Sequence, residues 1–414
     1  MPRTHTAIIG AGHAGLAMSR CLADRGVAHV VLDRGCVGER WRSARWDNFR
    51  MLTPNWLSAL PGWTYTGPDP DGFMTSAEFV NYLSAYARSF DAPVQPHTLV
   101  LRVERDAFGF AVHTNRGVWA ARNVVIATGY HSHAKVPDLA TGLAGELTQL
   151  TSARYRSPSG LPDGWVLVVG ASASGVQIAH ELIRAGRPVV LAVGRHTRLP
   201  RRYRGHDIIW WLDRIGAFDR TVDQVPDVEA ARAEPSLQLA GTPDARGIDL
   251  GVLLEEGVRL TGRLRGLDGT VATFADDLAE TVGAAQRRLS RVLADIDRYA
   301  TGLDPAVAPP DPPPPIPVPP VPPVPSSLDL AKVGISAVVW ATGYRPTYPW
   351  LAVPVLDHDG RIRHRRGITG VAGLYAIGLR FQYRRSSAFV DGARHDAAYL
   401  AEHITANGAN GHAA

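Results

Sequence analysis

The sequence predicts an α/β protein with two Rossmann-like domains of parallel strands and helices, one inserted into the other. Two stretches, 6–22 and 165–183, share one local plan in which an apolar strand runs into a glycine-rich turn and then an apolar helix. A second strand follows each stretch, so both read as βαβ units. The segments 124–130 and 338–344 are near copies that end in Ala-Thr-Gly-Tyr. Because these copies flank the second βαβ unit, we expect the second domain to interrupt the first.

The expected boundaries are 1–155 and 345–414 for the outer domain and 156–344 for the inserted domain. The inserted domain carries a helical insertion, 221–303, in which residues 276–303 read as an amphipathic helix with Asp276 or Asp277 as its N-cap. Residues 305–325 include 13 prolines. They predict a polyproline II connector, with an SH3-type ligand as the alternative. Residues 406–414 read as a loose tail.

Composition excludes several classes of protein. The chain has 414 residues and only two cysteines, Cys21 and Cys36, too few for a disulfide-rich secreted scaffold or a cysteine-based metal site. The 15 histidines form no HExxH pattern, so no metal is expected. The net charge is +5, but 42 of the 44 cationic residues are arginines without a basic block, so nucleic acid is not an expected partner. The sequence shows no apolar stretch typical of a secretory signal or of a membrane helix, and we expect a cytoplasmic location.

The first glycine-rich turn predicts a dinucleotide site. Gly10-Ala-Gly12-His-Ala-Gly15 follows a strand and opens a helix. Gly10 allows the tight turn, Gly12 lets a pyrophosphate approach the backbone, and Gly15 lets helix and strand pack closely. Asp33 ends the next strand, where its carboxylate can accept both ribose hydroxyls. We therefore expect a dinucleotide on the N-terminus of the first helix.

The second turn, Gly170-Ala-Ser172-Ala-Ser174-Gly175, is a variant with a small serine at the middle position. No acid ends the strand that follows, and Arg195 stands there instead. An arginine at this place suits a 2′-phosphate, which favours NADPH over NADH. An ordinary exposed arginine is the alternative reading. The two turns together suggest FAD in the first domain and NADPH in the second, with hydride passing between them.

The two cysteines do not form a redox pair. Cys36 has no second cysteine nearby, and Cys21 falls at a position expected to pack inside the first helix. A disulfide reductase needs such a pair beside the flavin. Electrons are therefore expected to pass from the flavin to dioxygen or to a small acceptor.

The chain resembles the class B flavoprotein monooxygenases, which include flavin-containing monooxygenases, N-hydroxylases and indole-3-pyruvate monooxygenases. The resemblance rests on the two glycine turns, on Gly38-Glu-Arg-Trp41 and 46–54, on both Ala-Thr-Gly-Tyr segments and on 373–378. It implies the glutathione-reductase-like FAD/NAD(P) fold, with FAD and NADPH as cofactors. It also implies dioxygen and a small organic substrate as partners, the substrate being oxygenated at nitrogen, sulfur or carbon by a C4a-(hydro)peroxyflavin. A homodimer is one expected assembly.

The resemblance also implies site residues. Segment 46–55 would lie along the flavin ring, and Asn55 would hydrogen-bond the peroxide or the nicotinamide ribose. From the residues themselves, Ser386 or Ser387 is expected to cap a helix over 388–404, whose N-terminus either stabilises the reduced flavin or has no role beyond the cap. The expected catalytic residues are Asn55, Arg380 and Ser387. The expected cofactor-binding residues are Gly10, Gly12, His13, Ala14, Gly15, Asp33, Arg34, Arg40, Trp41, Trp46, Met51, Leu52, Thr53, Val100, Thr128, Gly129, Gly170, Ser172, Ala173, Ser174, Gly175, Arg195, Thr342 and Gly343.

Two positions depart from the family pattern. Thr151 stands where the signature between the domains has a histidine, and Leu379 replaces an aspartate found in many related reductases. Two alternatives therefore stay open: an FAD-dependent NAD(P)H oxidase or reductase acting on a quinone or similar acceptor, and a flavin-bearing regulatory protein without turnover. Segment 201–211, rich in arginine and tryptophan, reads either as a lid over the nicotinamide or as interdomain packing.

Overall fold

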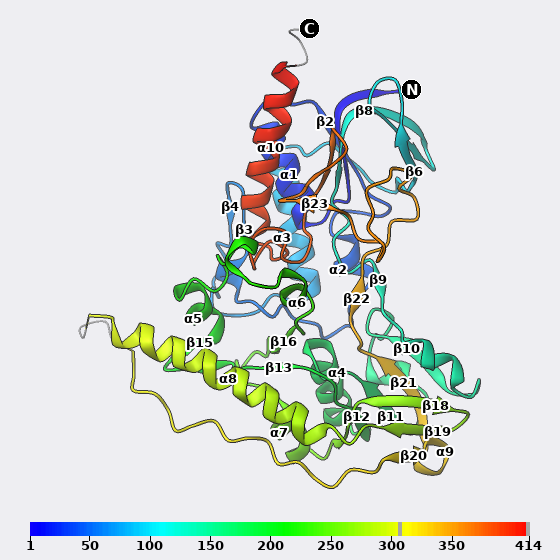
Figure 1. Ribbon diagram of the computed structural model, residues 1–414, viewed down its shortest axis with the longest axis vertical. Helices are drawn as coiled ribbons and strands as arrows, with labels where there is room; N and C mark the ends of the chain where they lie inside the picture. The colour runs from blue at the N-terminus through cyan, green and yellow to red at the C-terminus, as the bar shows by residue number, and fades with distance from the viewer. Residues whose placement is uncertain (305–308, 411–414) are drawn as a thin grey trace.

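The computed structural model describes residues 1–304 and 309–410. Two separate parallel sheets lie in the upper and lower parts of the molecule (Figure 1). Between them runs the antiparallel ribbon of β9 (His133–Ala134) and β22 (Tyr344–Arg345), so the residues that follow the two Ala-Thr-Gly repeats pair with each other. The predicted α/β fold with two Rossmann-like domains is confirmed.

The first sheet is built from both ends of the chain. Strands β25, β8, β1, β2 and β5 are parallel in that order, β24 and β23 continue the sheet antiparallel beyond β25, and β6 and β7 form an antiparallel pair beside β8. The bounds are β1 Arg3–Ile9, β2 His29–Leu32, β5 Val94–Gln95, β6 Val100–Arg105, β7 Phe110–Thr114, β8 Gly117–Ile126, β23 His364–Arg365, β24 Ile368–Thr369 and β25 Leu374–Ala376.

The second sheet comes from the chain between these two parts. Its strands β10, β21, β11, β12 and β17 are all parallel in that order, and an antiparallel sheet of β18, β19 and β20 lies next to it. The bounds are β10 Thr148–Thr151, β11 Trp165–Val169, β12 Val189–Ala192, β17 Arg259–Thr261, β18 Leu264–Asp268, β19 Val271–Phe274, β20 Ser327–Asp329 and β21 Ile335–Trp340. Strand β10 precedes residue 155 and already belongs to this sheet, and the boundaries at 155 and 345 stay predictions.

Short pairs and helices complete the chain. The two-residue strands pair as β3 Ala59–Leu60 with β4 Trp63–Thr64, β13 Thr197–Arg198 with β16 Leu237–Gln238, and β14 Arg202–Tyr203 with β15 His206–Asp207. The helices are α1 His13–Ala23, α2 Glu39–Ser43, α3 Ser76–Arg88, α4 Ala173–Arg184, α5 Ile208–Arg214, α6 Val228–Arg232, α7 Leu250–Glu255, α8 Leu278–Thr301, α9 Leu330–Val333 and α10 Ala393–Asn410. Among the described residues, no helix has the length and hydropathy needed to cross a bilayer.

The first sheet is buried on both faces, as a parallel sheet should be. Ile8 and Val125 belong to one apolar cluster with α1, α3 and α10, whereas Ile9 and Val124 belong to another. Successive strand residues thus face opposite sides. This arrangement fixes the carboxyl ends of β1 and β8 side by side, where ligands bind in open α/β sheets.

Helix α8 confirms the helix predicted over 276–303. Asp277 stands at its N-cap position, but the carboxylate accepts the Arg263 N–H at 3.0 Å instead of a helix N–H. Residues 309–325 run along α8 without regular secondary structure (Figure 1). Gln286 on α8 donates to the Ile316 carbonyl at 2.9 Å, which docks the connector onto the helix. The predicted positions 305–308 and 411–414 lie outside the described residues.

The start of the last helix was expected at residue 388, and this expectation is wrong. Helix α10 begins at Ala393, and residues 386–392 form turns. The reason is the Ser387 hydroxyl, which accepts the Tyr383 and Arg384 N–H groups at 3.1 and 2.9 Å and so closes a turn that precedes it. The helix also continues to Asn410, past the expected start of the tail at 406.

Candidate functional site

The first glycine turn is crowded at two positions and open at one. Gly10 has φ +113°, and a Cβ there would lie 2.6 Å from the Ala127 carbonyl oxygen. A Cβ on Gly15 would lie 1.9 Å from the Gly10 carbonyl oxygen. A Cβ on Gly12 would meet nothing within 4 Å. The strand and helix are therefore locked together, and the free space lies in front of Gly12, where a pyrophosphate would approach.

The second turn repeats this geometry. Gly170 has φ +106°, and its Cβ would lie 2.6 Å from the Ala341 carbonyl oxygen, while a Cβ on Gly175 would lie 1.8 Å from the Gly170 oxygen. Ser172 occupies the position of Gly12 at the N-cap of α4, and its side chain makes no cap hydrogen bond. The two turns thus present matching helix N-termini, which favour anions.

Asp33 ties the first turn to the end of β2. Its carboxylate accepts the Ala11 N–H at 2.7 Å and the Gly35 N–H at 2.9 Å. Burial raises the pKa of this carboxyl above its ordinary value, and the two backbone hydrogen bonds oppose the rise. Each carboxylate oxygen can accept more than one hydrogen bond, so a ribose hydroxyl can still be bound there.

Unpartnered polar atoms lie beside the first turn. The Thr128 hydroxyl, just beyond β8, and Nε2 of His13, at the start of α1, are buried without a hydrogen-bond partner among the described residues. Burial lowers the pKa of His13 to about 4, so the imidazole is neutral near pH 7. A Cβ on Gly129 would meet nothing within 4 Å. Free space in front of the backbone and buried polar atoms without hydrogen-bond partners are features that fit a bound dinucleotide such as FAD.

Between the carboxyl edges of the two sheets lies a cluster of arginines, tyrosines and one histidine. Sequence reasoning named two of its arginines, Arg40 and Arg380, and missed the other members, Arg45, Tyr130, His131 and Tyr344. The Tyr130 and His131 rings are 3.8 Å apart, and His131 meets the Tyr344 ring edge-on at 5.0 Å. The Tyr344 hydroxyl lies 3.0 Å from the Ser152 hydroxyl. Tyr130 and Tyr344 end the two Ala-Thr-Gly-Tyr copies, so the repeat itself was the available signal.

Three arginines surround this cluster. Burial lowers the pKa of the Arg45 guanidinium, which hydrogen-bonds Tyr344. Burial likewise lowers the pKa of Arg380 and brings that of Arg40 to about 10. Burial and the charges of these arginines hold the pKa of His131 well below its usual range. The cluster therefore combines fixed positive charge with a neutral imidazole, which can stabilise negative charge that develops nearby.

The aromatic residues of 41–51 form the wall next to the cluster. Trp41 packs edge-on against Phe79 at 4.8 Å, and Trp46 packs edge-on against Phe49 at 5.0 Å. The Arg45 guanidinium lies over the Trp41 ring at 4.6 Å. The rings of Trp41 and Phe49 thus hold Arg45 in place, and Trp46 packs against Phe49.

The side chains of two predicted catalytic residues, Asn55 and Ser387, form hydrogen bonds with backbone groups. Asn55 is 4% exposed; its amide nitrogen donates to the Asp69 carbonyl and its oxygen accepts the Met74 N–H, both at 2.8 Å. Ser387 is fully buried and closes the turn described above. Arg380, the third, donates to the Glu234 carbonyl and lies close enough to Tyr130 to affect its pKa. Of the three, only Arg380 joins the cluster.

The other predicted cofactor residues are divided between the two sheets. Arg195 follows β12, is exposed, and donates to the Ala233 carbonyl at 3.4 Å. Thr342 donates to the Lys135 carbonyl next to the connecting ribbon. Those along the first sheet or in the loops beside it are Ala14, Arg34, Met51, Leu52, Thr53 and Val100, and those along the second are Ala173, Ser174 and Gly343.

Segment 201–211 packs between the two parts of the chain. Arg201 is 1% exposed, forms a bidentate ion pair with Asp207 at 2.5 and 2.7 Å, and donates to the Leu52 carbonyl at 2.8 Å. Trp211 is fully buried. These contacts favour the packing interpretation of this segment over the lid.

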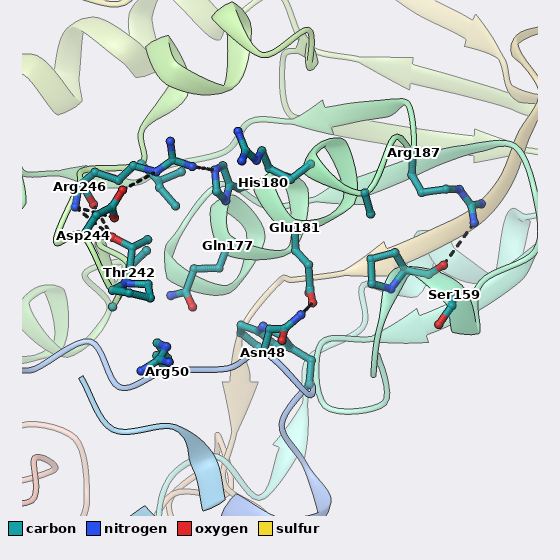
Figure 2. A pocket seen from close by; sticks show the side chains of 18 residues that line it. Asn48, Arg50, Ser159, Gln177, His180, Glu181, Arg187, Thr242, Asp244 and Arg246 are labelled. Carbon is teal, nitrogen blue, oxygen red and sulfur yellow. Dashed lines mark hydrogen bonds and ion pairs between the residues drawn. The ribbon is translucent and has the colours of Figure 1, made fainter. Parts of the chain in front are cut away.

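A cavity of about 930 Å³ opens where the loop 46–50 faces helix α4. Figure 2 shows Asn48 and Arg50 on the loop side and Gln177, His180 and Glu181 on the helix. Glu181 accepts the Asn48 amide at 2.7 Å and the Tyr155 hydroxyl at 3.0 Å, so one carboxylate joins both sides. The predicted residue Trp46 also lines this cavity.

Comparison with known proteins finds one matching family model and a number of similar proteins. The model, described as pyridine nucleotide-disulphide oxidoreductase, matches residues 7–210. The "uncharacterized oxidoreductase CzcO-like" of Geobacillus kaustophilus is 32% identical over 402 residues, which covers 96% of this chain and 97% of that protein. The indole-3-pyruvate monooxygenase YUCCA4 of Oryza sativa is 32% identical over 193 residues, 42% of this chain and 44% of that protein. The flavin-containing monooxygenase of Stenotrophomonas maltophilia shares the fold, with TM-score 0.64 and 20% identity over 98% of this chain and 99% of that chain.

Proposed function

Because this chain belongs to the family of CzcO-like oxidoreductases, and is a flavin-dependent oxidoreductase with FAD and NADPH as its cofactors, we propose that it is a monooxygenase of a small organic molecule. The observation that carries the proposal is the cluster of Arg45, Tyr130 and Arg380, which lies where the two sheets meet and contains no cysteine. Dioxygen or an organic molecule is the acceptor that such a site can serve.

The two cysteines support this choice over disulfide reduction. Cys21 is 4% exposed within α1, and Cys36 lies 3.6 Å from Nε2 of His97; both are free thiols. A flavoenzyme that reduces disulfides through its own cysteines needs two thiols that can bridge, with Cα atoms less than about 7 Å apart. The two cysteines of the chain form no disulfide, so the reducing equivalents have no protein disulfide to enter.

The roles proposed for the residues follow from their geometry. Gly12 and Ser172 admit the two pyrophosphates, Asp33 accepts a ribose hydroxyl of FAD, and Arg195 pairs with the 2′-phosphate of NADPH. When bound, FAD supplies the two-electron chemistry that carries reducing equivalents from NADPH to dioxygen.

Arg45 and Arg380 stabilise the negative charge that reduction brings to the space between the sheets. Burial raises the pKa of Tyr130, so its hydroxyl keeps its proton and can donate it as a hydrogen bond. His131, neutral among the arginines, adds no charge of its own. The indole-3-pyruvate monooxygenase activity of one relative supports oxygenation of a small organic substrate by this chain.

The test is rapid mixing of the FAD-loaded protein, first with NADPH without oxygen and then with oxygen. A monooxygenase is expected to lose its flavin absorbance with NADPH, and then, with oxygen and no substrate, to recover it in two phases, with hydrogen peroxide released only in the second, slow phase. Recovery in one phase, with hydrogen peroxide released as fast as the flavin is reoxidised, would instead indicate an oxidase. A flavin that NADPH leaves oxidised would indicate a protein without turnover.

A further inference from the structure

A second cavity, of about 440 Å³, lies away from the glycine turns. Its walls come from α1, the loop before β4, the hairpin of β23 and β24, the loop 378–392 and the start of α10. Cys21 on α1 is nine residues beyond Gly12, about 14 Å along the helix axis. No residue of either glycine turn lines the cavity. Its size suits a small ligand rather than a dinucleotide.

The Arg366 side chain is held in this wall by ring contacts, while its N–H groups have no hydrogen-bond acceptor among the described residues. Its guanidinium lies between two rings, 3.7 Å from the Tyr383 centroid and 3.9 Å from the Tyr399 centroid. Nε is buried without a partner, and the side chain makes no hydrogen bond or ion pair among the described residues. The backbone at Arg366 has φ +52°, which a non-glycine residue rarely adopts and which recurs at ligand sites. A planar, rigidly held guanidinium of this kind suits a carboxylate.

Asp396 supplies the opposite charge. It lines the same cavity, is 2% exposed, and its Oδ2 has no hydrogen-bond partner among the described residues. No arginine lies within ion-pair distance of it in the described part of the chain, although Arg366 shares the cavity. A half-buried cation and a buried carboxylate therefore share one cavity without an ion pair between them, an arrangement that is unfavourable unless a third group bridges them.

The other charges of the wall are already paired. Arg384 forms an ion pair with Asp219 at 2.5 Å, and Arg394 forms one with Asp391 at 3.0 Å. The rest of the wall includes the apolar surfaces of Pro61, Ala398 and Cys21. The unpaired charges of the wall are thus one guanidinium and one carboxylate, beside the rings of Tyr383 and His395 and an apolar surface.

We propose that this cavity binds an α-amino acid with an apolar side chain, its carboxylate on Arg366 and its ammonium on Asp396. Each charge of the ligand then meets an unsatisfied charge of the protein, and the side chain covers Pro61 and Ala398. The site does not depend on the reaction proposed above, because no residue assigned to the cofactors or to the cluster lines it.

The test is calorimetric titration of the full-length, FAD-loaded protein with L-leucine, 4-methylpentanoate and isopentylamine. The last two probes lack the ammonium and the carboxylate, respectively. We expect saturable 1:1 binding of L-leucine, and binding at least tenfold weaker for each truncated probe. Absence of saturable L-leucine binding, or equal affinity for 4-methylpentanoate, would overturn the proposal.

Variants assign the two ends of the ligand. Arg366→Gln is expected to weaken L-leucine binding at least tenfold. Arg366→Lys is expected to weaken it severalfold, because lysine keeps the positive charge but cannot form the two parallel hydrogen bonds of a guanidinium with a carboxylate. Asp396→Asn should weaken L-leucine but not 4-methylpentanoate. The matched control is Arg365→Gln, since Arg365 is the neighbouring exposed arginine and its side chain makes no hydrogen bond among the described residues. Flavin content and thermal unfolding verify that each variant is folded. Equal losses in the Arg365 and Arg366 variants would refute a specific site.

Discussion

At the scale of single residues, Asp33 does more than its sequence position suggests. Its two carboxylate oxygens accept the backbone N–H groups of Ala11 and Gly35. These bonds hold the loop before α1 against the end of β2. The ribose is therefore met by an acceptor that is positioned in advance.

Asp33→Asn is expected to weaken FAD binding at least tenfold and to lower the free energy of unfolding by about 1–3 kcal/mol. The reason is that the amide places an NH₂ group against one of the two backbone N–H donors. Flavin retention on dialysis and denaturant unfolding measure the two effects. The matched control is Asp106→Asn, because Asp106 also accepts two backbone N–H groups, at 2.9 and 2.8 Å, in the turn between β6 and β7. Equal flavin loss in both variants would contradict the assignment.

Arg195 decides which nicotinamide dinucleotide is used, if its proposed role holds. Arg195→Gln is expected to raise KM for NADPH about tenfold and to leave KM for NADH unchanged, because only NADPH carries the 2′-phosphate that the guanidinium would pair with. Steady-state oxidation of both dinucleotides measures the ratio. Arg291→Gln, which removes an exposed arginine of α8, is the control. A parallel rise for both dinucleotides would argue against a phosphate contact.

For single residues, the sequence predicted where a side chain would not fit, but it did not predict which groups a polar side chain would hydrogen-bond. The need for glycine at positions 10 and 15 follows from local backbone geometry. The motif alone therefore predicts where a Cβ would collide with the backbone. The partners of Asn55 are the backbone groups of Asp69 and Met74, which only the folded loop brings near. Arg45 was missed because its importance depends on Tyr344, a residue 299 positions away in the chain.

At the scale of elements, Arg198 joins four segments. It is 6% exposed and donates to Asp249 at the start of α7, to Gln286 on α8 and to the Pro317 carbonyl of the connector. The proline-rich connector has few N–H groups of its own to give. Its carbonyls are instead bound by side chains such as Arg198, which explains why the segment lies along α8.

Arg198→Met is expected to lower the free energy of unfolding by about 3 kcal/mol, because Asp249 keeps its charge in a partly buried place and loses its partner. The amides of α8 near Gln286 should also exchange faster with deuterium. Arg265→Met, at an exposed arginine of β18, provides the comparison. If α8 exchanged as slowly as in the parent protein, the connector would not be held through Arg198.

Asp396 makes the stability of the α10 region depend on pH. Burial raises its pKa from 3.8 to about 6, and a hydrogen bond from Ser387 opposes the rise. The unfolded carboxyl therefore ionises first as pH increases, and the native state loses about 3 kcal/mol between these two values. Asp396→Asn should show a smaller fall in thermal stability across this range. Asp138→Asn, at an exposed carboxyl, should keep the full fall.

Elements beside the glycine turns were predictable, and those between 221 and 277 were not. The strands and helices of the two βαβ units follow local apolar patterns, and so does α8. Strands of two residues such as β13 and β16 exist only because they pair with each other, and no local pattern marks them. The start of α10 was misread for a similar reason, since the Ser387 hydroxyl is used by the turn before it.

At the scale of the whole molecule, the insertion was predictable because the chain repeats Ala-Thr-Gly-Tyr where it leaves the first sheet after β8 and where it leaves the second sheet after β21. The relative position of the two sheets was not, since it depends on contacts between segments far apart in the chain. Glu181 makes one such contact on α4 by accepting the Asn48 amide and the Tyr155 hydroxyl at the edge of the 930 Å³ cavity. Burial raises its pKa above the ordinary value, which these two donors oppose.

If this contact helps to set the distance between the two cofactors, Glu181→Ala should slow reduction of the flavin by NADPH about tenfold, because a small misplacement of reacting groups lowers the rate steeply. FAD content and the Kd for NADPH should stay unchanged, since neither binding site contains Glu181. Glu181→Gln keeps an acceptor and should remain within about twofold of the parent rate. Anaerobic stopped-flow reduction measures the rate, with Glu280→Ala on the exposed side of α8 as control. An unchanged rate in Glu181→Ala would show that the two halves are aligned by other contacts, of which the Arg201 bond to the Leu52 carbonyl is the first to examine.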